Sequence, residues 1–181
     1  VLINGTNFID GTNCLVSGYF IALFLNIIIL ISSLNLNVSM QEIYPFLTSL
    51  IVFFVFNFFS RSFLGDGGSY LIAAFTGILL INFVNNLPNL MSPYYIILLL
   101  WYPAFENLFT ICRRGIFEKN KVDNPDNYHL HHLIYLNLIK VFKKKSFCNT
   151  ATGILINVFN ALEKSTPSSS RHNYAKISIR F

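Results

Sequence analysis

The N-terminal stretch of the chain could bind a polar ligand. It reads Asn4-Gly-Thr-Asn7-Phe-Ile-Asp10-Gly11-Thr-Asn13 and carries three amide side chains and one carboxylate within ten residues. Because Asp and Asn are also preferred helix caps, capping of the apolar segment that follows is the alternative explanation. One cap uses a single residue of this type, whereas the motif has four, so we expect ligand contacts here.

A second motif, FLGDGGS at residues 63–69, combines glycines with an acid and an aromatic residue directly before another apolar segment. Glycines let the backbone approach a ligand closely, and the amide groups at the start of a following helix favour an anion. Asp66 offers the hard oxygen ligands that Mg²⁺ prefers when it bridges phosphates. A tight turn would account for the glycines, but not for Asp66 or Phe63.

The third motif, His129-Leu-His131-His132, places three histidines within four residues. Such a cluster can bind a transition metal, donate hydrogen bonds to phosphate, or transfer protons. Because the run contains no Cys or carboxylate, contact with phosphate is favoured over a structural zinc site. A solvated polar loop is the remaining alternative.

Glu106 and Asn107 lie within an apolar segment, near its C-terminal end. Ionisable residues inside membrane segments mark functional sites, because burying them in lipid costs free energy. Glu106 also precedes Arg113 by about two helical turns on the same helix face, so an ion pair near the membrane surface is the alternative.

Long apolar segments must position these motifs. Of the 181 residues, 54% are hydrophobic and only 12% are charged, about half the charged fraction of soluble domains. The mean hydropathy is +0.54. We predict an all-α fold, a polytopic transmembrane helix bundle of about four spans, because four apolar segments approach the length that crosses a bilayer: residues 14–34, 43–59, 70–87 and 93–112.

The end of the chain differs from these segments. A short apolar helix is predicted over about residues 150–162, and the polar, Ser-rich residues 163–181 are predicted to be a disordered tail. The chain is therefore divided into part of a membrane domain, residues 1–162, and this tail.

The distribution of basic residues predicts the orientation in the membrane. Most Lys and Arg residues follow Cys112, and beside membrane segments such a cluster indicates the cytoplasmic side rather than nucleic-acid binding. The positive-inside rule then places residues 1–13, 60–69 and 113–150, with all three motifs, on the cytoplasmic face. This common face predicts a cytoplasmic site.

In this order and with this number of spans, the three motifs resemble the polyprenyl-phosphate N-acetylhexosamine-1-phosphate transferases of glycosyltransferase family 4. The resemblance covers about residues 1–162. It implies that Asp66 binds Mg²⁺ and that Phe63 stacks on uracil. It also implies contacts with the nucleotide-sugar for Asn4, Asn7, Asp10 and Gly11, and with the sugar and phosphates for His129, His131 and His132.

The resemblance also implies a reaction, namely transfer of a sugar-1-phosphate from a UDP-sugar to polyprenyl phosphate with release of UMP. Mg²⁺ would be the cofactor, and the enzyme would lie in the bacterial inner membrane, serve cell-envelope glycan synthesis and be compatible with a homodimer. The H-L-H-H spacing resembles the GlcNAc-type branch more than lipid I synthase. Lipid I synthase is therefore kept as an alternative.

Two departures from the family pattern limit this expectation. Asn13 replaces a second aspartate of many members, and the preceding D-D-x-x-D motif of the family is absent from the chain. We therefore expect the C-terminal part of a longer enzyme, inactive alone. A non-catalytic transporter fragment is a further alternative, in which polar residues within spans line a pathway: Asn26, Asn57, Asn82 and Glu106.

Overall fold

The computed structural model describes residues 1–33, 41–87, 93–113 and 129–164, with side chains up to residue 161. These residues form eight α-helices and no strand, which confirms the predicted all-α fold. The helices are α1 (Leu2–Ile9), α2 (Leu15–Ser33), α3 (Ile43–Phe58), α4 (Gly65–Asn86), α5 (Pro93–Leu99), α6 (Trp101–Arg113), α7 (Leu130–Phe142) and α8 (Lys145–Lys164).

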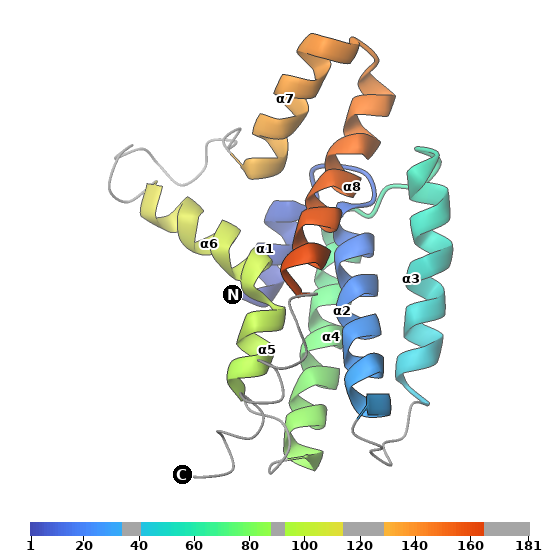
Figure 1. Cartoon of the computed structure of the whole chain (residues 1–181), viewed down its shortest axis with the longest axis vertical. Helices are drawn as coiled ribbons and strands as arrows, with labels where there is room; N and C mark the ends of the chain where they lie inside the picture. Colours follow the sequence, from blue (N-terminus) through green and yellow to red (C-terminus); the bar gives the residue numbers. More distant parts are fainter. Residues whose placement is uncertain (34–40, 88–92, 114–128, 165–181) are drawn as a thin grey trace.

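Helices α2, α3 and α4 run side by side in alternating directions (Figure 1). Helix α2 packs against α3 and α8 and supplies much of the core, with Phe20, Leu23 and Phe24 at most 1% exposed. Short helix α1 packs against α4 and α6, and α7 packs against α8. The α7–α8 hairpin extends past the N-terminal end of α2 (Figure 1).

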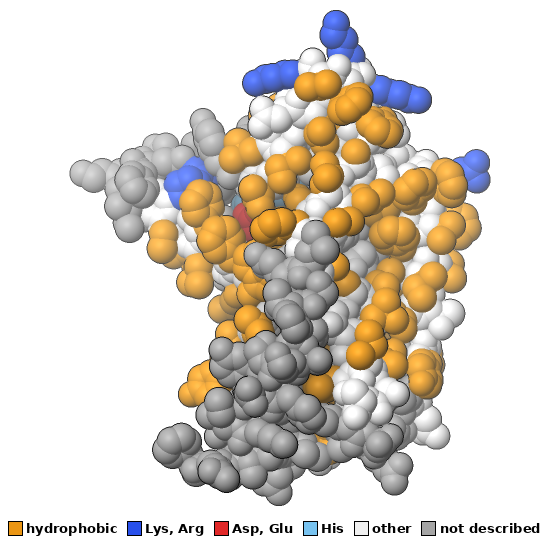
Figure 2. Space-filling model, in the orientation of Figure 1, with side chains coloured by type: hydrophobic (Ala, Val, Ile, Leu, Met, Phe, Trp, Pro, Cys, Tyr) orange, Lys and Arg blue, Asp and Glu red, His pale blue; other side chains and the backbone are white. Residues whose placement is uncertain are grey.

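The length and apolar composition of the helices are those of membrane spans. Among the described residues, α2 and α4 are long and apolar enough to cross a bilayer, and α5 with α6 adds a third span if this bent pair counts as one. Helix α3, with 16 residues, is apolar but shorter. Apolar side chains cover much of the visible flank, while lysines project where α7 meets α8 (Figure 2). The described part of the chain is thus a membrane helix bundle.

The predicted fourth span, residues 93–112, is a pair of helices bent by 72° rather than one straight helix. Proline has no backbone N–H, so Pro103 cannot donate to the carbonyl of Leu99, four residues earlier. The hydroxyl of Tyr19 donates to this Leu99 carbonyl instead. A side chain of α2 therefore stabilises the break and fixes the direction of α6.

The polar side chain of Asn13 joins the ends of three helices. Its Nδ2 donates to Ser60 Oγ at 2.8 Å and to Thr150 Oγ1 at 3.3 Å, after α3 and within α8. Its backbone N–H donates to Asn149 Oδ1 at 2.7 Å. The backbone here meets α8 closely, because a Cβ on Gly153 would lie 2.0 Å from the Asn13 carbonyl oxygen.

Three boundaries differ from the predictions. The segment 1–13, expected to be a loop, contains helix α1. Helix α4 begins at Gly65 rather than at residue 70, so most of the FLGDGGS motif is its first turn. Helix α8 extends over residues 145–164, where a short helix at 150–162 was expected. The tail from residue 165 onward lies outside the described residues.

Candidate functional site

Two acids from separate motifs meet at one end of the bundle. Asp10 follows α1, and Asp66 is exposed in the first turn of α4. Burial, and to a smaller extent the negative charge of Asp66, raise the pKa of the Asp10 carboxyl to about 7, although a hydrogen bond from the Gly65 backbone N–H opposes the rise. Gly65 has φ +64°, a conformation that glycine adopts without strain. The site therefore holds two carboxylates that repel each other.

Asn7 attaches α1 to the start of α4. Its Oδ1 accepts a hydrogen bond from Ser69 Oγ at 3.0 Å, and its Nδ2 donates to the hydroxyl of Tyr70 at 3.5 Å. Ser69 is fully buried, so this contact lies under the site rather than at its surface. In this structure Asn7 orients α1, and with it Asp10, against α4.

Gly11 lies against the ring of His131. A Cβ on Gly11 would lie 2.0 Å from His131 Nε2 and 2.7 Å from its Cδ2, so only glycine leaves room for the imidazole. Burial, with His129 beside it, lowers the pKa of His131 to about 4, which keeps the ring neutral at neutral pH. Its Nδ1 is buried without a hydrogen-bond partner among the described residues, and such a nitrogen can bind a ligand group.

His129 is held on two sides. Its ring stacks on Phe8 of α1 with centroids 5.4 Å apart, and on His131 with centroids 5.6 Å apart. Its Nδ1 lies 3.2 Å from Oε2 of Glu106 on α6. The third histidine, His132, is half-buried and has its ring centroid 6.4 Å from that of Tyr135.

Two further residues with predicted ligand contacts, Phe63 and Asn4, are exposed at the surface. Phe63 is 74% exposed and precedes α4, and Asn4 is exposed on α1. A Cβ on Gly65 or Gly67 would meet no atom within 4 Å, so the first turn of α4 is open around Asp66. An aromatic ring and an open helix start beside two acids leave space for a ligand approaching from outside.

A metal ion fits the acids only with help from outside this set. Among the described residues there is no group of three or more His, Cys, Asp or Glu side chains that could hold a metal. Asp10 and Asp66 nevertheless suit a hard cation, because each supplies oxygen ligands and their repulsion would be relieved by positive charge. Mg²⁺ commonly takes one or two carboxylates together with substrate phosphates and water.

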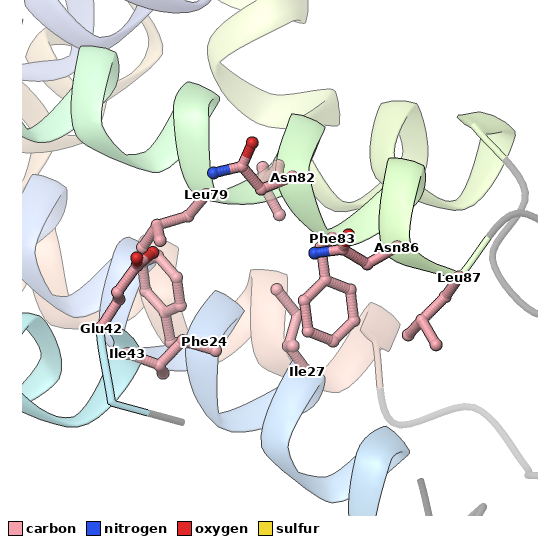
Figure 3. A pocket seen from close by; sticks show the side chains of 10 residues that line it. Phe24, Ile27, Glu42, Ile43, Leu79, Asn82, Phe83, Asn86 and Leu87 are labelled. Atoms are coloured by element: carbon pink, nitrogen blue, oxygen red, sulfur yellow. The ribbon is translucent and has the colours of Figure 1, made fainter. Parts of the chain in front are cut away.

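A pocket elsewhere in the molecule does not belong to this site. It lies between α2, α3 and α4 at their opposite ends, with Phe24, Ile27, Leu79 and Phe83 among its apolar lining residues (Figure 3). Its polar lining residues are Glu42, Asn82 and Asn86. None of the predicted site residues lines it, so the chemistry is assigned to the cluster around Asp10 rather than to this pocket.

Comparison with known proteins agrees with the first two motifs. The model of glycosyl transferase family 4 matches residues 1–84, a range that contains both Asp10 and Asp66. No curated protein and no solved structure matches the chain. The match supports membership of glycosyltransferase family 4. It thus supports a transferase and a membrane protein, in agreement with the apolar helices.

The structure adds residues that the motifs did not assign to the site. Phe8 stacks on His129, and Tyr70 contacts Asn7. Glu106, for which an ion pair with Arg113 was the alternative, contacts His129, Leu130 and Tyr102. Its position as an acid in an apolar segment had already made Glu106 a candidate in the sequence, whereas nothing in the local sequence distinguishes Phe8 from a core aromatic.

Proposed function

We propose that this chain carries part of an enzyme that transfers a sugar-1-phosphate from a UDP-sugar to polyprenyl phosphate and releases UMP. The observation that carries the proposal is the meeting of Asp10 and Asp66, two acids 56 positions apart, at one end of the helices that the family match covers. The carboxyl of Asp10 accepts the backbone N–H of Gly65, the first residue of α4, but capping of this helix start by Asp10 does not account for the second acid, Asp66.

The chemistry of the substrates suits these residues. An oxygen of polyprenyl phosphate would attack the β-phosphorus of the UDP-sugar, the bond to the α-phosphate would break, and UMP would leave with its electron pair. Asp10 and Asp66 would hold Mg²⁺, which would neutralise charge on the pyrophosphate. Neutral His131 would offer a ring nitrogen to a phosphate or sugar oxygen, and Phe63 would stack on the uracil.

We further propose an N-acetylhexosamine-1-phosphate donor, because the His129-Leu-His131-His132 spacing resembles the GlcNAc-type branch. Lipid I synthase remains the alternative within the same reaction class. The intact protein in membranes, given labelled UMP with UDP-GlcNAc or with UDP-MurNAc-pentapeptide, distinguishes the two donors. Exchange of label into UDP-GlcNAc alone supports the proposal, and exchange only with the pentapeptide donor replaces it.

Asp66→Asn tests the metal role with little risk to folding, because Asp66 is exposed. We expect exchange to fall to background, since the amide cannot replace a charged oxygen ligand. Glu42→Gln is the matched control, since Glu42 is an exposed acid at the N-terminal end of α3, whereas Asp66 follows its C-terminal end. Substantial exchange by Asp66→Asn contradicts the metal role. No exchange by the unaltered protein with any UDP-sugar contradicts the function.

The transporter alternative depends on polar residues within the spans. Asn26 donates to the carbonyl of Ala22 in its own helix at 2.7 Å. Asn57 accepts the backbone N–H of Cys14 and donates to the carbonyl of Ser62. These contacts give both amides local structural roles, which favours the transferase. Uptake of a labelled solute into vesicles that requires Asn57, without any exchange activity, would favour the transporter instead.

A further inference from the structure

Glu106 is a buried acid without a role in the reaction described so far. The residue is 0% exposed on α6. A carboxylate in such a place loses its hydration and must gain hydrogen bonds in return. Its donors therefore indicate what the residue does.

Three donors converge on this carboxylate. Oε1 accepts the backbone N–H of Leu130 at 3.1 Å and the hydroxyl of Tyr102 at 3.4 Å. Oε2 lies 3.2 Å from Nδ1 of His129. One donor comes from α6 itself, and the other two come from the start of α7. The contact therefore joins two helices through Glu106 and Leu130, which are 24 positions apart in the sequence.

Leu130 is the first residue of α7, and His129 is its N-cap. The first N–H groups of a helix have no partner within it and are usually capped by the N-cap side chain. The His129 side chain makes no such capping hydrogen bond. Glu106 supplies the missing acceptor from another helix, and its negative charge at the positive end of the α7 dipole is favourable.

The first turn of α7 carries the whole histidine motif. His129 rests on Phe8, and His131 fills the space left by Gly11. Along its length α7 packs against α8, so the contacts of its first turn bring the histidines to the N-terminal motif. A displacement of this end would separate His131 from Gly11.

We propose that Glu106 is a positioning residue: it caps α7 from α6 and sets the places of His129 against Phe8 and of His131 against Gly11. The contact between Glu106 and His129 also fixes the proton of a neutral His129 ring on Nδ1, since that nitrogen must donate to the carboxylate. This inference rests on the proposed function only for its effect on catalysis. The cap itself is a property of the fold.

Two variants of the intact protein separate the cap from the histidine contact. In Glu106→Gln, an amide oxygen can still accept the Leu130 N–H, but an NH₂ group faces Nδ1 of His129. In Glu106→Ala, both contacts disappear. Tyr102→Phe removes only the hydroxyl, and Glu42→Gln is the control acid away from the site.

Hydrogen exchange of the segment that begins at Leu130 reports the cap without any activity. We expect faster exchange there in Glu106→Ala and near-normal exchange in Glu106→Gln, Tyr102→Phe and Glu42→Gln. Unchanged exchange in Glu106→Ala overturns the cap, whether or not the unaltered protein transfers sugar phosphate.

Exchange of labelled UMP then reports the positioning. Loss of the carboxylate partner of a metal-binding histidine commonly costs about 10–100-fold in activity, and we expect a similar cost for the partner of His129. We expect kcat to fall by about this factor in Glu106→Gln while KM for the UDP-sugar changes little, because the proposed nucleotide contacts, Asn4 and Phe63, lie outside α6 and α7. A normal kcat in a folded Glu106→Gln overturns the positioning role. If Glu106→Ala does not fold, the kcat of Glu106→Gln still decides the positioning role.

Discussion

Gly11→Ala should disturb the site through a single methyl group. The added Cβ would lie 2.0 Å from His131 Nε2, 2.7 Å from Cδ2 and 3.0 Å from Cε1. Heavy atoms pack at about 3.5–4.0 Å, so the ring must retreat by more than about 1 Å. Little room exists for this movement, because His131 is 6% exposed and stacks on His129.

The expected cost has two parts. Forcing an extra methyl group into a packed region usually destabilises by about 1–3 kcal/mol. A displacement of about 1 Å at a catalytic group can also reduce the rate about 100-fold. We therefore expect a lower unfolding temperature in detergent and roughly 100-fold slower exchange of labelled UMP. Gly77→Ala is the matched control, because its Cβ would meet only Leu2 Cδ2 at an ordinary 3.7 Å.

A double-mutant cycle identifies the cause of the destabilisation. If Gly11→Ala acts through the His131 ring, its effect on the unfolding temperature should nearly vanish in a His131→Ala background, because the methyl group then has space. An equal effect in both backgrounds would refute the steric argument. Normal stability and activity of Gly11→Ala alone would refute the close contact itself.

The remaining predictions concern the acids and Phe63. Asp10 has a pKa of 3.8 in an unfolded chain and about 7 in the fold, so the folded protein binds the proton more tightly. Its contribution to stability is complete below pH 4 and declines as the pH rises to about 7; Asp10→Asn should flatten this part of a plot of unfolding temperature against pH. Asp66→Asn should lower the pKa of Asp10, which narrows the pH range over which the contribution of Asp10 to stability declines. Phe63→Leu should raise KM for the UDP-sugar with no change in unfolding temperature, because Phe63 is 74% exposed, whereas Phe63→Tyr, which keeps an aromatic face, should keep KM.

The apolar segments predicted the helices well because membrane length and composition constrain them strongly. Helices α2 and α3 begin and end within one residue of the predicted limits. The bend between α5 and α6 was also within reach of the sequence, since Pro103 in an apolar segment predicts a break. Only the tertiary structure, however, shows that Tyr19 of α2 binds the carbonyl left free.

Helix α1 could not be predicted from its local sequence. The segment Leu2–Ile9 contains a glycine, two asparagines and a threonine, which favour turns over helices. Tertiary contacts override this preference: Asn7 bonds to α4, and Gly5 lets α1 approach Pro103, whose carbonyl oxygen would lie 2.2 Å from an added Cβ. The same glycine that weakens the helix locally allows the packing that holds it.

Residue type alone also leaves open how each acid is used. Glu106 accepts hydrogen bonds from the Leu130 N–H and the Tyr102 hydroxyl and faces His129, so both of its carboxyl oxygens have partners within the fold. Asp10 has the opposite situation, because burial and Asp66 both disfavour its charge and raise its pKa. A cation would therefore gain more at Asp10 and Asp66 than beside Glu106. We expect Mg²⁺ to lower the pKa of Asp10, which assigns metal binding to the acids left in repulsion and positioning to the acid that is already satisfied.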